Sequence, residues 1–385
     1  MTKFSQRMND VEPFRVVEVL TRAKELEAQG RSIMHLEAGE PDFDTALPIV
    51  EAGIAALKAG QTHYTPACGI PELREAISHF YKNDYGLDIS PQRIMVTPGA
   101  SGALMLAAAL LTDPGDSMIM ADPGYPCNRQ FVRLVEGFAQ LVPVNASQRY
   151  QLTANAARAA WQNSTIGAVV ASPANPTGEI LSANELADLY KEVNSHNGTL
   201  IVDEIYHGLD YDEKASSILA ITDQAIVINS FSKYFGMTGW RLGWLVAPEA
   251  AVNEMEKLAQ NLFISMSTPA QYAALACFDP ATRKILDQRR DIFKQRRDYL
   301  LPALRDIGFH IPNKPAGALY LYADASKFTD DCQQFCIDML ENHGVAITPG
   351  VDFGSHRCKT HVRFAYTTSM ECLKEAVNRL TKALA

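Results

Sequence analysis

Residues 225–243 read AIVINSFSKYFGMTGWRLG, and this stretch is the most informative part of the chain. An apolar run typical of a β-strand, Ala225–Ile228, stops in polar residues that include Lys233, and Arg241 then opens a second apolar run. A lysine at the mouth of a buried strand loses solvation, so its amine is more easily neutral and nucleophilic, as Schiff-base chemistry with an aldehyde requires. An arginine fork nearby suits a phosphate. The two residues together predict an anchor for pyridoxal phosphate, provided that the rest of a cofactor site is found elsewhere in the chain.

The bulk composition is that of an ordinary soluble globular protein, with 385 residues, 47% hydrophobic and 21% charged content. A chain of this length can bury a large core and most often forms two domains. The formal net charge of -9 argues against a nucleic-acid partner and against binding to an anionic membrane surface.

Cysteine usage and the apolar runs bear on the compartment of the protein. The seven cysteines are odd in number and lack zinc-type spacing, so we expect a reducing environment and no metal site. Residues Met1–Asp10 lack the apolar core of a signal sequence, and the longest apolar run, Ala103–Leu111, is too short to cross a bilayer. We therefore expect a cytoplasmic protein that has no membrane partner.

From about residue 92 onward, short apolar runs alternate with helical patterns. The expected strands are Arg93–Thr97, Ser117–Ala121, Gln140–Val144, Ile166–Ala171, Thr199–Val202, Ala225–Ile228 and Leu242–Ala247. Helices expected between them include Ala100–Leu111, Cys127–Val135 and Ala183–Asn194. Such alternation predicts an α/β domain with a mostly parallel sheet covered by helices on both faces.

The pattern changes after Phe278-Asp279-Pro280, where a second, smaller α/β domain is expected. A long charged helix, roughly Thr282–Asp306, leads to the remaining elements. These are the strands Ala318–Tyr322, Val345–Thr348 and His361–Tyr366 and the helices Cys332–Asn342 and Met370–Leu384, with the N-terminal helix Phe14–Gln29 added to them. The expected division is a large domain over residues 45–280 and a small domain formed by residues 1–44 and 281–385.

Polar residues at the carboxyl ends of the expected strands are candidate site residues, because ligands in open α/β sheets bind there. Residues 98–102 end one strand and open a helix whose first N–H groups lack partners, which makes a phosphate cradle. Alone this is a weak signal, since tight turns need glycine anyway. Tyr125 follows the next strand, where its ring could stack on a planar cofactor, although core packing explains a single tyrosine equally well.

The next two strands end in stronger candidates. Asn175 lies in the segment Ser172–Gly178 and its amide can donate to a phenolic oxygen, although the segment also has the composition of a simple turn. Asp203 closes an apolar strand, where desolvation is costly unless a cation such as a protonated pyridine nitrogen pairs with the carboxylate. The alternative is a solvent-accessible helix N-cap. Tyr206 lies close enough in sequence to reach the same ring.

These residues resemble those of the class I/II (fold type I) pyridoxal-phosphate aminotransferase family, and the match runs along nearly the whole chain. The motifs that carry it are GEPDF at 39–43, YTP at 64–66, GIPELR at 69–74, NPTG at 175–178, DEIY at 203–206, SFSK at 230–233 and VRF at 362–364. The resemblance implies a large domain with a mostly parallel mixed sheet between helices, a smaller α/β domain, and pyridoxal 5'-phosphate as the cofactor. It also implies a homodimer whose active sites lie at the interface.

The resemblance also implies a role for each matching residue. Lys233 would be the Schiff-base lysine, Asp203 the partner of the pyridine nitrogen, and Tyr125 the stacking ring. The phenolic oxygen would be held by Asn175 and Tyr206, and the phosphate by Arg241, Ser230, the backbone of Ala100 and Ser101, and Tyr64 from the partner subunit. Arg363 would bind the substrate carboxylate as a bidentate fork, helped by Asn175 and the Gly39 backbone.

Several functional alternatives share these features. A carbon–sulfur β-lyase uses the same fold and anchors. A nicotinamide-dependent oxidoreductase would show a similar sheet, but the chain lacks G-x-G-x-x-G after its first strand, and Lys233 would have no role. A non-catalytic ligand sensor on this fold usually carries an added DNA-binding domain, for which Met1–Asp10 leaves no room. The sequence therefore favours an enzyme that moves an amino group from an amino acid to a 2-oxo acid.

The expected substrate side chain depends on one position. In an aspartate-selective branch that resembles this chain, a lysine at the start of the phosphate-cradle helix meets the second carboxylate, and here Ser101 occupies the matching position. A dicarboxylate would lack that charge partner. Phe14, Tyr125 and Phe353 could instead accept an apolar or aromatic side chain, with Arg15 as a possible substitute cation. We therefore expect broad, neutral or aromatic donors with 2-oxoglutarate as acceptor, and an aspartate aminotransferase is the alternative.

Overall fold

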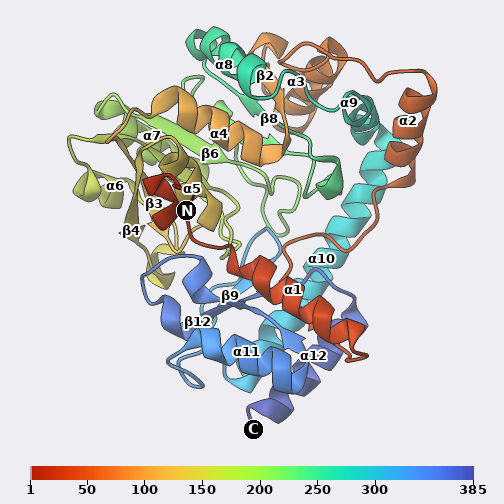
Figure 1. Cartoon of the computed structure of the whole chain (residues 1–385), viewed down its shortest axis with the longest axis vertical. Helices are drawn as coiled ribbons and strands as arrows, with labels where there is room; N and C mark the ends of the chain where they lie inside the picture. The colour runs from red at the N-terminus through yellow and green to blue at the C-terminus, as the bar shows by residue number, and fades with distance from the viewer. Residues whose placement is uncertain (1) are drawn as a thin grey trace.

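A seven-stranded mixed sheet forms the larger layer of the protein, which a computed structural model describes over residues 2–385 (Figure 1). Its strands, in spatial order, are β2 (Ile94–Thr97), β8 (Gly243–Val246), β7 (Ile226–Ser230), β6 (Thr199–Asp203), β5 (Thr165–Ala171), β3 (Ser117–Asp122) and β4 (Phe138–Pro143). Only β8 runs antiparallel to its neighbours. Each strand expected in this part of the sequence is present, and the predicted mostly parallel mixed sheet is confirmed.

Helices cover both faces of this sheet because its strands are apolar on both sides. On β6, Ile201 packs into one hydrophobic cluster, whereas Leu200 and Val202 pack into another. The helices of the layer are α2 (Leu47–Lys58), α3 (Pro71–Tyr85), α4 (Gly99–Leu111), α5 (Pro126–Leu134), α6 (Ala154–Ala160), α7 (Ala183–Ser195), α8 (Glu249–Leu262) and α9 (Thr268–Leu275). Near-continuous apolar strands covered in this way are typical of parallel sheets.

The C-terminal part of the chain forms two smaller sheets. Strands β11 (Thr348–Pro349), β12 (His361–Ala365) and β9 (Tyr320–Asp324) make an antiparallel sheet, and β1 (Met34–His35) pairs in parallel with β10 (Val345–Ala346). The expected strand Val345–Thr348 is therefore wrong as a single element. Its first half pairs with β1 and its second half with β12, so the chain changes sheet at Ile347.

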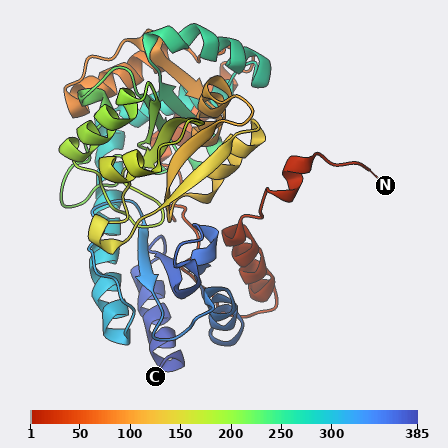
Figure 2. The same ribbon diagram turned by 90° about the vertical axis from the view of Figure 1, so that its left-hand side faces the viewer.

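Four helices complete this layer and join it to the larger one. They are α1 (Arg15–Ala28), α10 (Pro280–Ile307), α11 (Cys332–His343) and α12 (Met370–Ala383). The 28-residue α10 runs from the large layer down to the small one, and Figure 2 shows α1 beside the small sheets with the N-terminal arm projecting from the body. Within residues 2–385, no helix combines the length and apolar character needed to cross a bilayer.

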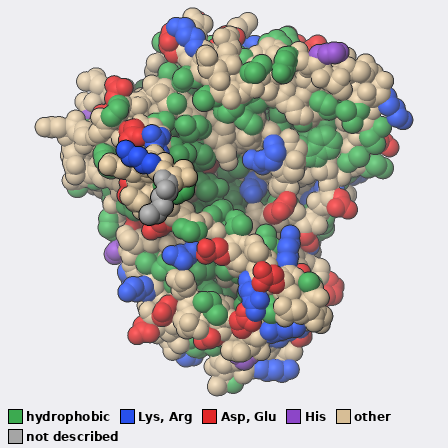
Figure 3. Space-filling model, viewed as in Figure 1, with side chains coloured by type: hydrophobic (Ala, Val, Ile, Leu, Met, Phe, Trp, Pro, Cys, Tyr) green, Lys and Arg blue, Asp and Glu red, His purple; other side chains and the backbone are tan. Residues whose placement is uncertain are grey.

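The carboxyl ends of the parallel strands point toward the small layer. Asp203 at the end of β6 is paired in register with Ala171 on β5 and Ile228 on β7, so the segments that follow these strands leave the sheet side by side. The surface is hollowed between the two layers, and basic side chains lie along the hollow (Figure 3).

Candidate active site

A cavity of about 400 Å³ lies where the strand ends meet the small layer and the start of α1. The residues predicted for the site that line it are Gly39, Ala100, Ser101, Tyr125, Asn175, Asp203, Tyr206, Lys233, Arg241 and Arg363. A larger groove of about 700 Å³ between α6 and α7 contains none of them. Residues that are far apart in the sequence are therefore brought together in one place, as the strand-end argument predicts.

Lys233 and Asp203 lie at the ends of neighbouring strands of the large sheet. The Lys233 Nζ donates a hydrogen bond to the Gly39 carbonyl oxygen at 2.6 Å. The Asp203 carboxylate is buried and accepts from the backbone N–H of Ile205 at 3.1 Å. Burial raises the pKa of Asp203 to about 7, while Lys233 works in the opposite direction. No cationic group within residues 2–385 forms an ion pair with Asp203, so a cation on a bound group would further stabilise its ionised form.

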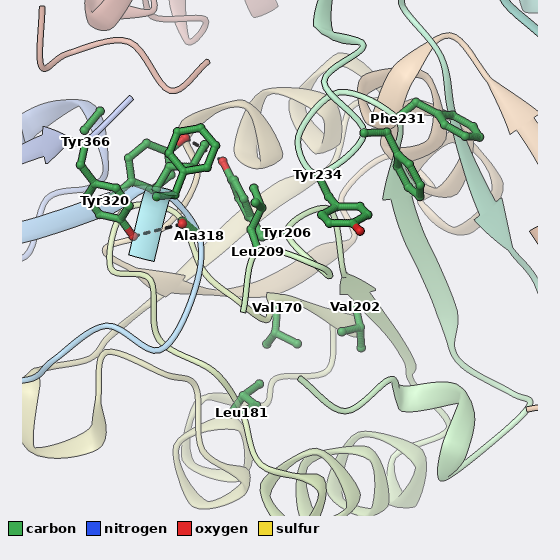
Figure 4. Close-up of a cluster of buried hydrophobic side chains, with 14 of the residues drawn as sticks. Val170, Leu181, Val202, Tyr206, Leu209, Phe231, Tyr234, Ala318, Tyr320 and Tyr366 are labelled. Carbon is green, nitrogen blue, oxygen red and sulfur yellow. Dashed lines mark hydrogen bonds between the residues drawn. The ribbon is translucent and has the colours of Figure 1, made fainter. Parts of the chain in front are cut away.

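Tyr206 contacts a residue that the sequence reasoning missed. Its hydroxyl lies 2.7 Å from the hydroxyl of Tyr320 on β9, and both rings belong to the buried cluster of Figure 4. A Cβ on Gly39 would lie only 2.2 Å from the Tyr320 hydroxyl oxygen, so glycine is required there. Tyr320 also lines the cavity. Its position depends on how the small layer packs on the large one, for which the sequence carries no local signal.

The other end of the cavity is shaped to receive an anion. Arg241 lies at the N-terminus of α4, whose first turn has N–H groups without intrahelical partners. A Cβ on Gly99 would lie 2.7 Å from an Arg241 Nη atom, so the guanidinium sits directly against the helix start. The Arg241 Nη1 donates to the carbonyl of Thr238 at 3.0 Å, which leaves its other donors free for an anion.

Ser230, a predicted phosphate contact, does not line the cavity. It is buried as the last residue of β7, and its hydroxyl lies 3.2 Å from the Leu242 carbonyl oxygen and 2.9 Å from the Ser232 hydroxyl. Ser232 lines the cavity instead. The strand β7 runs through Ser230, past the predicted end at Ile228, and the lining serine lies two residues further on.

Arg363 lies on β12 as a buried guanidinium without an ion-pair partner among the described residues. Its Nη1 donates to the Asn175 side-chain oxygen at 3.0 Å, and its Nη2 donates to the Glu37 carbonyl oxygen at 2.5 Å. The aromatic rings of Tyr320 and Phe353 lie 4.3 and 4.9 Å from its central carbon. Within residues 2–385, its Nε has no hydrogen-bond partner. A buried cation in this state is costly unless it receives an anion, as a carboxylate-binding arginine does.

Apart from Glu40 and Thr238, the remaining side chains of the cavity wall are apolar, and several of them come from α1. They include Phe14, Val16, Val17, Leu20, Leu104 and Ile205. The Phe14 ring packs edge-to-face on Tyr125 with centroids 6.2 Å apart. Phe353 borders the adjoining smaller cavity rather than this one, and Arg15 lines neither. The sequence predicted Phe14 and Tyr125 in this wall but missed the apolar face of α1.

Tyr64 does not line the cavity of its own chain, and its side chain is 82% exposed. It lies between α2 and α3, on the large layer. This placement neither brings Tyr64 to the site nor excludes the predicted contact with a second subunit.

The site fits pyridoxal phosphate. Within residues 2–385 the Asp203 carboxylate has no ion-pair partner, the Arg241 fork lies against a helix N-terminus, and the Lys233 amine lines the same cavity. Fold and cavity together define a fold type I pyridoxal-phosphate enzyme.

Comparisons with known proteins identify the family. A family model described as "Aminotransferase class I and II" matches residues 31–380. The chain is 37% identical over 383 residues to a (5-formylfuran-3-yl)methyl phosphate transaminase of Methanocaldococcus jannaschii, covering 99% of each chain. It is 37% identical over 372 residues to a valine–pyruvate aminotransferase of Mycobacterium tuberculosis, covering 96% of each. Other relatives are named aspartate aminotransferases.

A crystal structure of an aminotransferase from Mycobacterium tuberculosis superposes with a TM-score of 0.97 at 36% identity, covering 100% of this chain and 99% of that one. The chain therefore belongs to the class I and II aminotransferases, which are pyridoxal-phosphate-dependent transferases.

Proposed function

We propose that this aminotransferase takes its amino group from a neutral or aromatic L-amino acid. The observation that carries the proposal is the set of charges in the cavity. Its basic side chains are Lys233, Arg241 and Arg363, and each has a role in binding the cofactor or the α-carboxylate. No further basic side chain lines the cavity within residues 2–385 to pair with a second carboxylate, and the wall beyond Tyr125 is apolar. Burying an unpaired carboxylate there would cost on the order of 1–3 kcal/mol or more.

The proposed roles follow the contacts of each side chain. When bound, pyridoxal phosphate supplies an aldehyde for amine exchange and a protonated ring that withdraws electrons from the substrate Cα. Lys233 would hold the aldehyde and then, as a free amine, move the proton of the substrate Cα. Asp203 would keep the ring nitrogen protonated, and Arg363 would orient the α-carboxylate. Arg241 would bind the phosphate.

The remaining contacts serve the same two ligands. Asn175 and Tyr206 would bind the phenolic oxygen and Tyr125 would stack on the ring. Ser230, Ser232 and the Ala100 and Ser101 backbone would complete the phosphate site, and the Gly39 backbone would face the substrate. The 2.7 Å contact between Tyr206 and Tyr320 supports adding Tyr320 to this group.

The proposed acceptor is 2-oxoglutarate. Its second carboxylate would meet the same apolar wall as that of aspartate, so pyruvate is the competing acceptor. A half-reaction with each 2-oxo acid and the aminated enzyme measures the preference. Release of pyruvate and ammonia without any acceptor would instead reveal a β-lyase activity.

The donor preference gives the first testable prediction. We expect kcat/KM for alanine or phenylalanine to exceed that for aspartate, because only aspartate places a charge against the apolar wall. The measurement is kcat/KM for the three donors with a fixed acceptor. An aspartate preference of several orders of magnitude would mean that another cation reaches the cavity and that the proposal is wrong.

A pair of variants at one position sharpens this test. Ser101→Lys puts a cation at the start of α4 and should raise kcat/KM for aspartate relative to phenylalanine by about tenfold. Ser101→Met, which has similar length and no charge, should not. If both variants act alike, the change reflects the shape of the cavity and not charge.

We also propose a cytoplasmic homodimer with sites at the interface, built from a large domain of residues 45–280 and a small domain of residues 1–44 and 281–385. Support for the dimer comes from α2, which exposes the apolar side chains of Leu47, Ile54 and Leu57 next to the 82% exposed Tyr64. Such apolar exposure is typical of a protein interface.

Mixed dimers test the role of Tyr64 across that interface. A Tyr64→Ala subunit keeps Lys233, and a Lys233→Ala subunit keeps Tyr64, so one site of the hybrid contains both residues. We expect each parent variant to be inactive or weak and the mixture to regain activity after subunit exchange. If no activity returns once exchange has been verified, Tyr64 does not serve the partner's site.

A further inference from the structure

The segment Glu37–Gly39, which follows β1, contacts both of the cations that act on the substrate. The Glu37 carbonyl oxygen accepts from the Arg363 guanidinium at 2.5 Å. Two residues later, the Gly39 carbonyl oxygen accepts from the Lys233 amine at 2.6 Å. The position of this short backbone segment therefore helps to set where both side chains point.

The Glu37 side chain makes contacts of its own from the same segment. Its carboxylate is fully buried, one oxygen lies 2.8 Å from the Nδ1 of His35, and the other oxygen has no hydrogen-bond partner. The His35 Nε2 lies 3.2 Å from the carboxylate of Glu27 on α1. A chain of charges thus runs from the surface of α1 through His35 to the buried Glu37.

His35 is the only cationic side chain that forms an ion pair with Glu37 within residues 2–385. The hydrogen bond to Glu37 raises the pKa of His35 to about 9, so its imidazole is protonated at neutral pH. A carboxylate that loses its only counter-charge inside a protein is destabilised and must move toward water or take up a proton. Because the Glu37 carbonyl and carboxylate belong to one residue, such a move would also shift the acceptor that holds Arg363.

We propose that His35 is a positioning residue for the α-carboxylate site, which acts by neutralising Glu37 and so keeping the carbonyl of that residue in place against Arg363. The inference rests on the proposed role of Arg363 as the carboxylate-binding residue. A purely structural ion pair would stabilise the fold without changing substrate affinity. The KM of the amino donor distinguishes the two roles, because only the positioning role changes it.

The test compares three variants of the cofactor-loaded enzyme. His35→Leu leaves the Glu37 carboxylate without its cation, and His35→Leu/Glu37→Leu removes both charges. His196→Leu is a control for the loss of a histidine–carboxylate pair outside the cavity, because His196 lies 3.2 Å from the buried Glu192 on α7, which keeps its ion pair with Arg158. The measurements are kcat and KM for the preferred amino donor, calorimetric binding of 3-phenylpropanoate as an unreactive carboxylate, and the thermal unfolding midpoint.

We expect His35→Leu to raise both the KM of the donor and the Kd of 3-phenylpropanoate about tenfold, with kcat changed by less than about threefold, because a misplaced Arg363 weakens carboxylate binding. The double variant should return both constants to within about threefold of the wild type, since replacing both partners of a buried pair by apolar groups is often neutral. His196→Leu should leave both constants unchanged.

A lowered unfolding midpoint in His35→Leu with unchanged KM and Kd would overturn the inference, as would a double variant with constants raised tenfold. If His35→Leu does not fold, the double variant alone decides by that same criterion. Arg363→Lys separates this inference from the proposed function. If Arg363→Lys and His35→Leu both keep the wild-type KM, the carboxylate site itself is misassigned. If Arg363→Lys raises the KM and His35→Leu does not, the result counts only against the role of His35.

Discussion

Replacing Lys233 by alanine is expected to abolish transamination while the protein still binds pyridoxal phosphate. The amine that is removed is proposed to serve both as the covalent anchor and as the base that moves the Cα proton, so turnover should fall by about 10⁴-fold or more. The Asp203 carboxylate and the Arg241 fork remain in the cavity, and their contacts do not depend on Lys233. Non-covalent binding of the cofactor should therefore persist.

Three measurements on purified Lys233→Ala check this expectation: cofactor content, the visible absorbance of the lysine-linked cofactor, and single-turnover transamination. We expect retained cofactor, an absent lysine-linked band and no detectable turnover. Lys257→Ala is a suitable control because Lys257 lies on α8 with a largely exposed side chain. Near-normal transamination by Lys233→Ala would show that the assignment of the anchor is wrong.

The strand-end residues were predictable from the sequence because a parallel sheet places them side by side. Asp203 closes β6 in register with Ala171, the last residue of β5, and Lys233 follows the neighbouring strand β7 by three residues. An apolar run followed by a polar residue is a local signal, so it can be found without the fold. The carboxyl ends of the strands then bring Asn175, Asp203 and Lys233 into one cavity.

Residues of the small layer were not predictable in the same way, because their positions depend on long-range packing. Tyr320 meets Tyr206 across 114 positions of sequence, and nothing near Tyr320 indicates that contact. The apolar side of α1 has the pattern of any amphipathic helix, so Val17 and Leu20 gave no sign that they face a cavity.

Errors in strand boundaries also had consequences for the site. The strand expected to end at Ile228 continues to Ser230, and Ser232, which the sequence reasoning did not single out, lines the cavity just beyond the strand. The expected strand Val345–Thr348 divides between two sheets because hydrophobic pattern alone does not specify which strand pairs with which.

Replacing Arg363 by lysine is the second substitution expected to have a large effect. Lysine keeps the positive charge but presents one ammonium group in place of a planar fork. In the protein, the two Nη atoms of Arg363 already donate to the Asn175 side chain and the Glu37 carbonyl, and the unpaired Nε shows that the guanidinium has donors to spare. A lysine cannot make these contacts and also bind a carboxylate with two parallel hydrogen bonds.

We expect Arg363→Lys to lower kcat/KM for every amino donor by on the order of 100-fold, because the α-carboxylate is common to all of them. This factor corresponds to a loss of a few kcal/mol, roughly, in transition-state stabilisation. The absorbance of the bound cofactor should not change, since Lys233, Asp203 and Arg241 are untouched. Arg357→Lys is the matched control, because Arg357 precedes the same strand and its side chain is 61% exposed.

The loss of kcat/KM in Arg363→Lys should be similar for alanine and phenylalanine, because the substitution acts on the carboxylate and not on the side chain. A variant that is as active as the wild type with both donors would place the carboxylate site elsewhere in the cavity, whereas a loss confined to one donor would assign Arg363 to recognition of the side chain.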